Sequence, residues 1–376
     1  MRPFGRTVAA AVTAAATALC LSLTTANPAA ASDPGFACLV GRTAKPPVPG
    51  VILDVRGPGV TFTGAGGKFQ LGGRDMRPSD AFRAASVTKT FTAATVLKLA
   101  EQHKLRLDDR IGKYLDPRLV ERVHVIKGRS YGAQITVRQL LDHTAGLYDY
   151  ATAEDWAAYV GAHPRKTWTP AELVDWAVTR GKPYFKPGEG YHYSDTGYIL
   201  AGYIIEKVTH QPLHRAYRSL LLDPLGLRGT YLEHWEKHRG APVSHAYLGS
   251  VDTGNWNPTF DTFAGGGLVS TVADLTTFFR ALFEGKVFHD PATLRVMLTA
   301  TPQSKGTYGI GIERLAANGE VLWFHPGAWG AVAAYSPARK VSVVATVNQA
   351  QDDGALSALL RDAYALALGK PVPGCG

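Results

Sequence analysis

Long apolar runs are scarce in this sequence of 376 residues. After the N-terminal segment, no stretch reaches the roughly eighteen uninterrupted apolar residues that a membrane-spanning helix needs. Blocks of about five or six basic residues are also missing, which argues against a nucleic-acid-binding tract. The sequence has no internal repeat, and 45% of its residues are apolar. Disorder is therefore excluded, and the chain is long enough to bury one large core or two smaller ones.

The N-terminal segment has the composition of a secretory signal. Arg2 and Arg6 precede an apolar run from Val8 to Leu23, and Ala29-Ala30-Ala31 supplies small residues at a cleavage point. We therefore expect a signal peptide at residues 1–31, a mature chain that begins near Ser32, and a secreted, extracellular protein.

The charge of the chain is positive and evenly spread. The sequence has 40 basic and 31 acidic residues, a formal charge of +9, and removal of Arg2 and Arg6 with the signal leaves +7. This charge fits residence near an anionic cell wall or surface, although solubility alone would account for it.

Cysteine is rare, with three residues, of which Cys20 lies inside the signal. Cys38 and Cys375 remain, one near each end of the mature chain, and an exported protein can keep such a pair oxidised. We predict a disulfide between them, with two unpaired thiols as the alternative. For so long a loop, the chain-entropy model gives a stabilisation of roughly 5 to 6 kcal/mol as an upper estimate.

Strand-like patterns lie at both ends of the mature chain, and helix-like patterns fill its middle. Strands are predicted at 51–56, 60–63, 321–325, 331–335 and 341–347. Capping boxes begin helices at Thr136 and Thr169, and further helices are predicted at 90–103, 198–208, 271–284 and 355–368.

This order of elements predicts an α+β fold. One antiparallel β-sheet, built from both ends of the chain and flanked by helices, would carry an inserted, mostly helical domain. We assign the sheet subdomain to about residues 32–104 and 272–376, and the helical subdomain to about residues 105–271.

The tetrad Ser86-Val87-Thr88-Lys89 precedes the predicted helix at 90–103. Residues three apart share one face of a helix, so the Ser86 hydroxyl and the Lys89 amine could meet within one turn. A hydroxyl beside its own base is what a serine hydrolase needs, and the unpaired N–H groups of a helix start favour negative charge there. The same four residues also fit a helix-capping serine and a surface lysine.

A second element is the segment Tyr193-Ser194-Asp195, on a loop just before a predicted helix. The Tyr193 hydroxyl could exchange a proton with Ser86 or with a leaving group. A half-buried aromatic side chain is the alternative interpretation of Tyr193.

A third element is His325-Pro326-Gly327 at the end of a predicted strand, followed by Ala328-Trp329. It would place a basic residue beside a glycine-lined strand edge, where a substrate backbone could lie and where N–H groups could bind an oxyanion. A turn that ends a strand is the structural alternative.

Taken together and in this order, the three elements resemble the serine β-lactamase and penicillin-binding group. The branch in question holds class C β-lactamases, secreted D-alanyl-D-alanine carboxypeptidases and related esterases, with a β-lactamase/transpeptidase-like fold. That group uses a Ser-x-x-Lys, a Tyr-x-Asn and a late Lys or His followed by x-Gly. The resemblance runs over nearly the whole mature chain, through stretches at 135–150, 264–271 and 308–311.

The resemblance implies acyl transfer at Ser86. Ser86 would attack a carbonyl carbon, Lys89 and Tyr193 would move its proton, and water would then release the acyl group. Neither a metal ion nor an organic cofactor is needed.

The resemblance also assigns roles to the third element. One backbone N–H after Gly327, at Ala328 or Trp329, would bind the oxyanion together with the N–H of Ser86. His325 would supply positive potential or a hydrogen bond near Tyr193.

Two departures from the family pattern bear on the substrate. Asp195 stands where asparagine is common, so an amide that could donate to a substrate becomes an acceptor-only carboxylate beside Lys89. Pro326 stands where carboxypeptidases usually carry threonine, and Ala328 adds no hydroxyl, which weakens recognition of a terminal carboxylate. Arg314 could bind a substrate carboxylate instead, or could be a solvated surface residue.

The expected substrate is a small peptide, an ester or a β-lactam, including peptides of the cell-wall peptidoglycan. We place a D-alanyl-D-alanine carboxypeptidase-like activity first, an esterase second and a class C-like β-lactamase third. We also expect a monomer that binds no nucleic acid and has no membrane span after loss of the signal.

Two other functions are considered. Gly128-Arg129-Ser130-Tyr131-Gly132 matches the nucleophile elbow of α/β-hydrolases, but no helix follows at once and the pattern of a parallel sheet is missing. A catalytically inactive penicillin-binding or sensing module of the same fold is the non-enzyme alternative, because function depends on the site and not on the fold.

Overall fold

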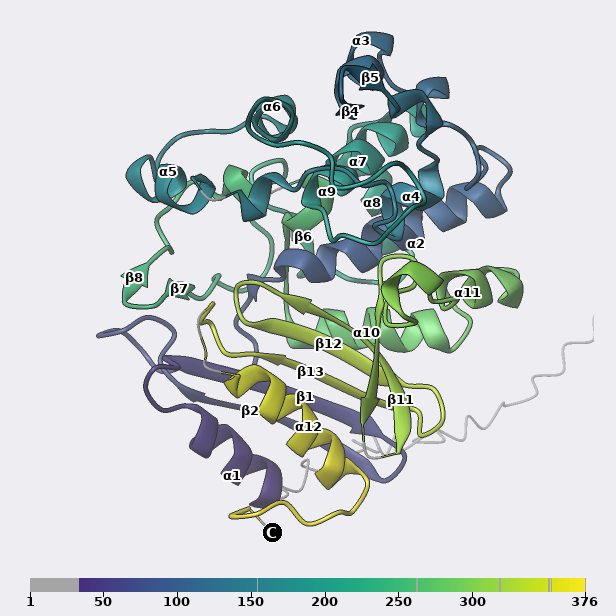
Figure 1. Ribbon diagram of the computed structural model, residues 1–376. Coiled ribbons are helices and arrows are strands. Elements are labelled where there is room, and N and C mark those ends of the chain that lie inside the picture. Colours follow the sequence, from purple (N-terminus) through teal and green to yellow (C-terminus); the bar gives the residue numbers. More distant parts are fainter. Residues whose placement is uncertain are drawn as a thin grey trace, which may run out of the picture. The chain divides into compact units, whose positions relative to one another are not determined.

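A computed structural model describes residues 34–153, 155–261, 263–317, 319–350, 352 and 354–375. The predicted signal segment at 1–31 and the cleavage point lie outside the described residues. Figure 1 shows the sheet and the helices of the part that is described.

The fold is built on a six-stranded antiparallel sheet in the order β10-β11-β12-β13-β1-β2. Its strands come from the two ends of the chain, as predicted, because β1 pairs with β13 in the register Ile52↔Thr346. The bounds are β1 (Gly50–Gly57), β2 (Val60–Gly67), β10 (Glu313–Ala317), β11 (Glu320–Gly327), β12 (Ala331–Ser336) and β13 (Val341–Thr346).

Helices cover both faces of this sheet (Figure 1). On one face, α1 (Pro34–Thr43) and α12 (Ala355–Ala367) pack side by side, and their Phe36 and Leu359 belong to the same core as Leu53 of β1. On the other face lies α10 (Val272–Phe283), whose Phe278 belongs to the same core as Ile52. Strands buried on both faces carry nearly continuous apolar runs, and β13 is accordingly buried along its whole length.

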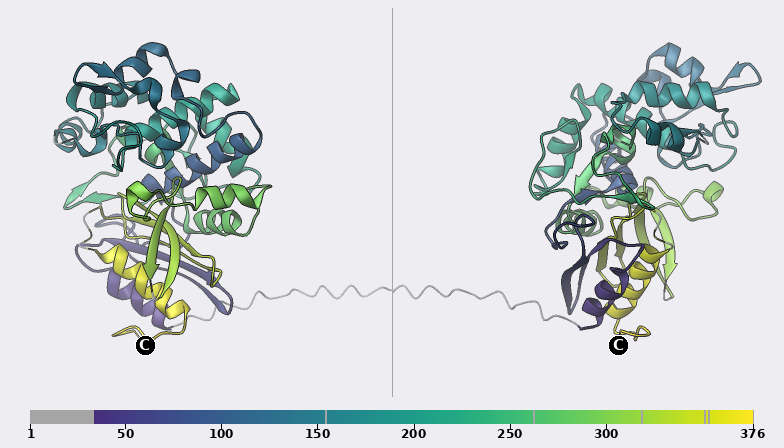
Figure 2. Two further views of the ribbon diagram at one scale, coloured as in Figure 1. Left: turned by 45° about the vertical axis from the view of Figure 1, so that its right-hand side comes forward. Right: turned by 90° about the vertical axis from the view of Figure 1, so that its left-hand side faces the viewer.

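Most of the remaining helices lie on the side of the sheet away from α1 and α12, as both views of Figure 2 show. The remaining helices are α2 (Thr88–Glu101), α3 (Pro117–Arg122), α4 (Val137–Leu141), α5 (Trp156–Ala162), α6 (Pro170–Arg180), α7 (Asp195–Thr209), α8 (Leu213–Tyr217), α9 (Phe263–Gly266) and α11 (Pro291–Met297). Short strands accompany them: β3 (Phe82–Arg83), β4 (Val125–Ile126), β5 (Arg129–Ser130), β6 (Tyr231–Leu232), β7 (Tyr247–Leu248), β8 (Val251–Asp252) and β9 (Leu268–Ser270). The predicted α+β fold with helices inserted between the two halves of a sheet is confirmed.

The capping boxes expected from the sequence are formed. Thr136 accepts a hydrogen bond from the Gln139 N–H at the start of α4, and Thr169 accepts one from the Glu172 N–H at the start of α6. In both cases the side chain of the third helical residue accepts a hydrogen bond from the backbone N–H of the capping threonine. These bonds satisfy N–H donors that a helix start leaves without partners.

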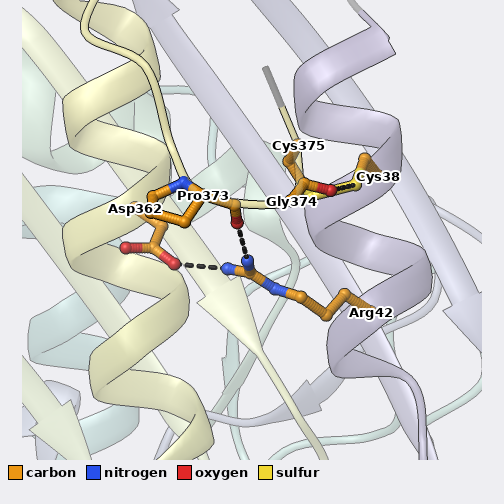
Figure 3. Close-up of a disulfide and its surroundings, with 6 residues drawn as sticks. All are labelled: Cys38, Arg42, Asp362, Pro373, Gly374 and Cys375. Carbon is orange, nitrogen blue, oxygen red and sulfur yellow. Dashed lines mark hydrogen bonds and ion pairs between the residues drawn. A yellow bond between two sulfur atoms is a disulfide. The ribbon is translucent and has the colours of Figure 1, made fainter.

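The disulfide between Cys38 and Cys375 is present, with Cα atoms 5.5 Å apart (Figure 3). It joins α1 to the segment that follows α12. Arg42, one turn further along α1, reinforces the same junction through an ion pair with Asp362 and a hydrogen bond of 2.9 Å to the Pro373 carbonyl. Both ends of the described chain are thus fixed on one face of the sheet.

Candidate active site

Ser86 lies at a sharp turn that starts a helix. It belongs to the short 3-10 helix η1 (Ala85–Val87), which continues directly into α2. Ala85 has a φ of +46°, in the left-handed region that residues with a β-carbon rarely adopt. Such strain persists only where the surrounding structure enforces it, and it is common at functional sites. Here it turns the chain just before Ser86.

Lys89 follows one turn later on the same helix face, as its spacing predicted. Its side chain is fully buried, whereas Ser86 is half-buried. Lys89 Nζ donates to Ser86 Oγ at 2.9 Å and to the Gly265 carbonyl at 2.9 Å, and it forms an ion pair with Asp195. The alternative of a surface lysine is therefore wrong.

Tyr193 and Asp195 reach this pair from the start of α7. Lys89 Nζ lies 4.8 Å from the centre of the Tyr193 ring, and Ser86 is close enough to the Tyr193 hydroxyl to act on its pKa. Burial, together with the negative charge of Asp195, raises the pKa of Tyr193 well above its usual value, so that the hydroxyl keeps its proton. The structure thus brings Ser86, Lys89, Tyr193 and Asp195 together.

Two further carboxyl groups, which the sequence did not single out, flank Asp195. Asp149 is fully buried, and its Oδ1 accepts the backbone N–H of Asp195 at 3.0 Å. Asp261 accepts the indole N–H of Trp329 at 3.0 Å. Burial and the charge of Asp195 raise the pKa of each to about 7. Below about pH 7 both groups are therefore protonated.

His325 is buried and uncharged. Its pKa is lowered to about 3, first because burial disfavours the cation and second because Lys89 is close. The ring nitrogens lie 2.8 Å from the Pro326 carbonyl and 3.0 Å from the Tyr308 hydroxyl, so Nδ1–H donates and Nε2 accepts. Positive potential, one of the two roles expected for His325, does not fit these surroundings. The other role was a hydrogen bond near Tyr193: the bond is made with the Tyr308 hydroxyl, and the ring centres of His325 and Tyr193 lie 6.4 Å apart.

The residues after His325 end β11 beside the nucleophile. An added β-carbon on Gly327 would lie 2.3 Å from the Ala84 carbonyl, so only glycine allows this approach. Gly330 donates its N–H to the Gly327 carbonyl at 2.9 Å, which places Ala328 and Trp329 in a tight turn and not on the strand. Pairing with β10 stops at Phe324, so Pro326 lies where β11 has a free edge, a position that tolerates proline.

Arg314 is exposed on β10 and forms no side-chain hydrogen bond or ion pair with the residues that the structure describes. It pairs with Trp323, whose side chain belongs to the core that faces the site. Its neighbour Glu313 is half-buried, and burial raises the pKa of that carboxyl to about 7, although the positive charge of Lys89 acts to lower it.

His143 is a further residue that sequence analysis missed. It is buried, and its ring lies 4.3 Å from the Tyr193 ring and 4.7 Å from the Tyr308 ring, measured between centres. Its Nδ1 accepts the Ser194 N–H at 3.1 Å, which fixes the loop that carries Tyr193. The stretch 135–150 was noted for its resemblance, but nothing in a single sequence distinguishes His143 from a core histidine.

Other candidate centres are not supported. Ser130 lies in a two-residue antiparallel hairpin, β4–β5, followed by a 3-10 turn, whereas a nucleophile elbow joins a parallel strand to a helix. Among the described residues, no group of three His, Cys, Asp or Glu side chains is arranged to hold a metal ion. No helix within the described ranges has the length and apolar character needed to cross a membrane.

Comparison with known protein families and sequences gives one consistent result. The family model described as beta-lactamase matches residues 37–366. Penicillin-binding protein 4* of Bacillus subtilis is 26% identical over 322 residues, which cover 79% of this chain and 67% of that protein. Protein flp of Staphylococcus aureus is 29% identical over 185 residues, which are 49% of this chain and 34% of that protein. The chain thus spans about two thirds of the first relative and one third of the second.

Solved structures give the same fold. A D-stereospecific amidohydrolase from Streptomyces has a TM-score of 0.74 and 30% identity, over 86% of this chain and 96% of that one. A penicillin-binding protein homologue from Pyrococcus abyssi has a TM-score of 0.72 and 28% identity, over 86% and 74%. A D-amino acid amidase from Ochrobactrum anthropi has a TM-score of 0.73 and 25% identity, over 89% and 98%.

Proposed function

The chain belongs to the beta-lactamase family of serine hydrolases, and we propose that it cleaves amide bonds through an acyl-enzyme on Ser86. Its first substrate class would be peptides that end in D-alanyl-D-alanine, as for a D-alanyl-D-alanine carboxypeptidase. The observation that carries the proposal is the contact of 2.9 Å between Lys89 Nζ and Ser86 Oγ, on a buried lysine that also contacts a carboxylate.

The proposed reaction uses the four residues that meet at the start of α2. Ser86 Oγ attacks the substrate carbonyl, and Tyr193, which keeps its proton, donates to the leaving nitrogen. The oxyanion is bound by the N–H of Ser86 at the helix start and by an N–H of the turn at Ala328 or Trp329. Gly327 supports this arrangement because it holds the turn against Ala84.

D-amino acid amides are the second candidate substrate class. Two similar structures are a D-stereospecific amidohydrolase and a D-amino acid amidase. The site favours a substrate without a terminal carboxylate for two reasons. The carboxyl groups of Asp149, Asp195 and Asp261 near Lys89 would repel a substrate carboxylate when they are ionised. The end of β11 also offers no hydroxyl to bind a carboxylate, because its residues are Pro326 and Ala328. A carboxypeptidase substrate would depend on Arg314, which is free to bind a carboxylate on the exposed edge.

Acylation and turnover test the proposal together. Purified protein would be treated with a fluorescent penicillin and an activated ester, and its mass would be measured. We expect one adduct in the wild type and none in Ser86→Ala. Ser130→Ala is the matched control, because it removes the serine of the rival elbow motif and should retain the adduct.

Turnover then separates the substrate classes. An acetylated D-Ala-D-Ala peptide, a D-amino acid amide, a short-chain ester and a cephalosporin would be compared side by side. Hydrolysis of the peptide supports the carboxypeptidase, and hydrolysis of the amide alone supports the second candidate. An adduct without turnover of any substrate would indicate a penicillin-sensing module, and a wild type without an adduct would refute the nucleophile.

Export as a monomer completes the proposal. The predicted signal at 1–31 supports export, and the Cys38–Cys375 disulfide is compatible with an oxidising compartment. The mature N-terminus of the protein recovered from culture medium and its mass in solution would test both points.

A further inference from the structure

The contacts of Lys89 raise the question of where the proton of Ser86 goes. An ammonium group has three hydrogens and no acceptor. Lys89 Nζ has three oxygen partners within contact distance: Ser86 Oγ, the Gly265 carbonyl and Asp195 Oδ1. These match a protonated lysine with every hydrogen engaged. Such a lysine cannot accept the proton of Ser86 until it has released one of its own.

Only one of the three partners can receive that proton. Ser86 is the source of the incoming proton, and the Gly265 carbonyl belongs to a peptide bond. Asp195 is a carboxylate in direct contact with Lys89 Nζ. Tyr193 keeps its own proton, as described above, and so it is no alternative acceptor.

The other titratable groups around the pair do not compete for this role. Burial leaves His143 and His325 uncharged, and both accept hydrogen bonds from other residues. Asp149, Asp261 and Glu313 have pKa values raised to about 7, and none of them has a hydrogen bond to Lys89 Nζ.

We propose that Asp195 is the proton acceptor for the nucleophile, acting through Lys89. This inference rests on the proposed acyl-enzyme. As Ser86 Oγ bonds to the substrate carbon, its proton moves to Lys89 Nζ, and one proton of Nζ moves to Asp195 Oδ1. The carbonyl electron pair becomes the oxyanion. When the tetrahedral intermediate collapses, Tyr193 protonates the leaving nitrogen and regains a proton from Lys89, which takes back the proton held by Asp195.

Burial makes this transfer easier than it would be in water. Lys89 is fully buried and the Asp195 side chain is 10% exposed. The first half of the relay moves a proton from the ammonium to the carboxylate and converts a buried ion pair into two neutral groups, which burial favours. The neutral amine then takes the Ser86 proton and becomes an ammonium again as the oxyanion forms. Asparagine, the residue more common here in the family resemblance, cannot accept a proton. The departure at Asp195 would thus change the route of the proton and not only the substrate.

The opposite effect of Asp195 is the outcome to be excluded. A carboxylate beside a lysine stabilises the charged lysine, and Asp195 could hold Lys89 permanently as an ammonium. In that case asparagine would release Lys89 to act as the base and would accelerate acylation.

The rate of acylation as a function of pH separates the two outcomes. Wild type, Asp195→Asn and the control Asp274→Asn would be mixed rapidly with an activated ester between about pH 5.5 and 9.5. Asp274 is a half-buried carboxylate of α10 that accepts the Gly229 N–H at 2.8 Å, so its variant carries the same chemical change away from Lys89. Melting temperatures would establish that each variant is folded.

We expect the wild type to acylate well below about pH 9, because the Lys89–Asp195 pair acts as one acceptor, whereas an ordinary lysine loses its proton only at about pH 10.4. In Asp195→Asn the fall of the rate on the acidic side should move up by about one pH unit or more, which is a loss of about tenfold at low pH. Asp274→Asn should follow the wild type.

Three results would contradict the inference. An unchanged acidic limb in Asp195→Asn, or faster acylation at low pH, would overturn it while the acyl-enzyme stands. If Asp195→Asn does not fold, the pH profile of the wild type is the test. A wild-type acylation rate that already falls below about pH 9 would indicate a lysine that acts without Asp195, and it would overturn the inference. A wild type that never acylates would refute the proposed function itself.

Discussion

Removal of the disulfide should destabilise the protein through its unfolded state. The Cys38–Cys375 bridge closes a loop with a sequence separation of 337. The chain-entropy model gives such a loop roughly 6 kcal/mol of stabilisation at 25 °C, and measured effects usually fall below the model. We therefore expect Cys38→Ser combined with Cys375→Ser to lower the free energy of unfolding by about 2 to 5 kcal/mol.

The native fold should survive this change. Both cysteines pack in the core formed by α1, α12 and one face of the sheet, and Arg42 still joins α1 to Asp362 and Pro373. Urea denaturation followed by circular dichroism would measure the free energy of unfolding. The slope against urea should increase, because the unfolded chain without its crosslink exposes more surface.

Arg42→Ala is the matched control for the junction. It removes the ion pair and the hydrogen bond shown in Figure 3 but leaves the crosslink, and an exposed ion pair contributes about 1 kcal/mol or less. A double serine variant that loses no more stability than Arg42→Ala, with an unchanged slope, would refute the loop-closure argument.

Two other substitutions test the surroundings of Ser86. Asp149→Asn keeps the acceptor for the Asp195 N–H but removes a group whose pKa is about 7 when folded and 3.8 in the reference state. The folded protein holds this proton more tightly, so stability is lost as pH rises from about 4 to 7. The free energy of unfolding of the variant should therefore exceed that of the wild type by about 1 to 4 kcal/mol at pH 8 and equal it at about pH 4. An equal gain at both pH values would contradict this prediction. Gly327→Ala would place a carbon 2.3 Å from the Ala84 carbonyl, and it should cost about 1 to 3 kcal/mol and slow acylation. Gly41→Ala is the control, because a β-carbon there would meet no atom within 4 Å and the backbone has no positive φ.

Most of the fold prediction came from local patterns of apolar residues. The strands β1, β2, β11, β12 and β13 were predicted because apolar residues alternate or run continuously there. The strand β10 was missed, since Glu313-Arg314-Leu315-Ala316 has no β-branched residue and forms only at the edge of an existing sheet. The helix α1 was also missed, and its apolar face is evident only against the sheet that it covers.

The candidate site was predictable where residues are close in sequence. Ser86 and Lys89 are three residues apart on one helix, so their contact follows from helix geometry. Asp149 and Asp261 come near Lys89 from distant parts of the sequence and interact with its charge, and an isolated aspartate has no local signal. The neutral state of His325 depends on burial and on Lys89, which only the folded chain provides.

The pairing of β1 with β13 has a consequence for how the molecule is made. Ile52 meets Thr346, so the centre of the sheet joins the first and the last strands of the chain. Until β13 has been synthesised, β1 has only β2 as a partner, and an isolated hairpin is marginal in water. Folding must therefore follow synthesis, with the slow kinetics of distant contacts. A truncation that removes β13 would separate the three strands β10, β11 and β12 from the hairpin of β1 and β2.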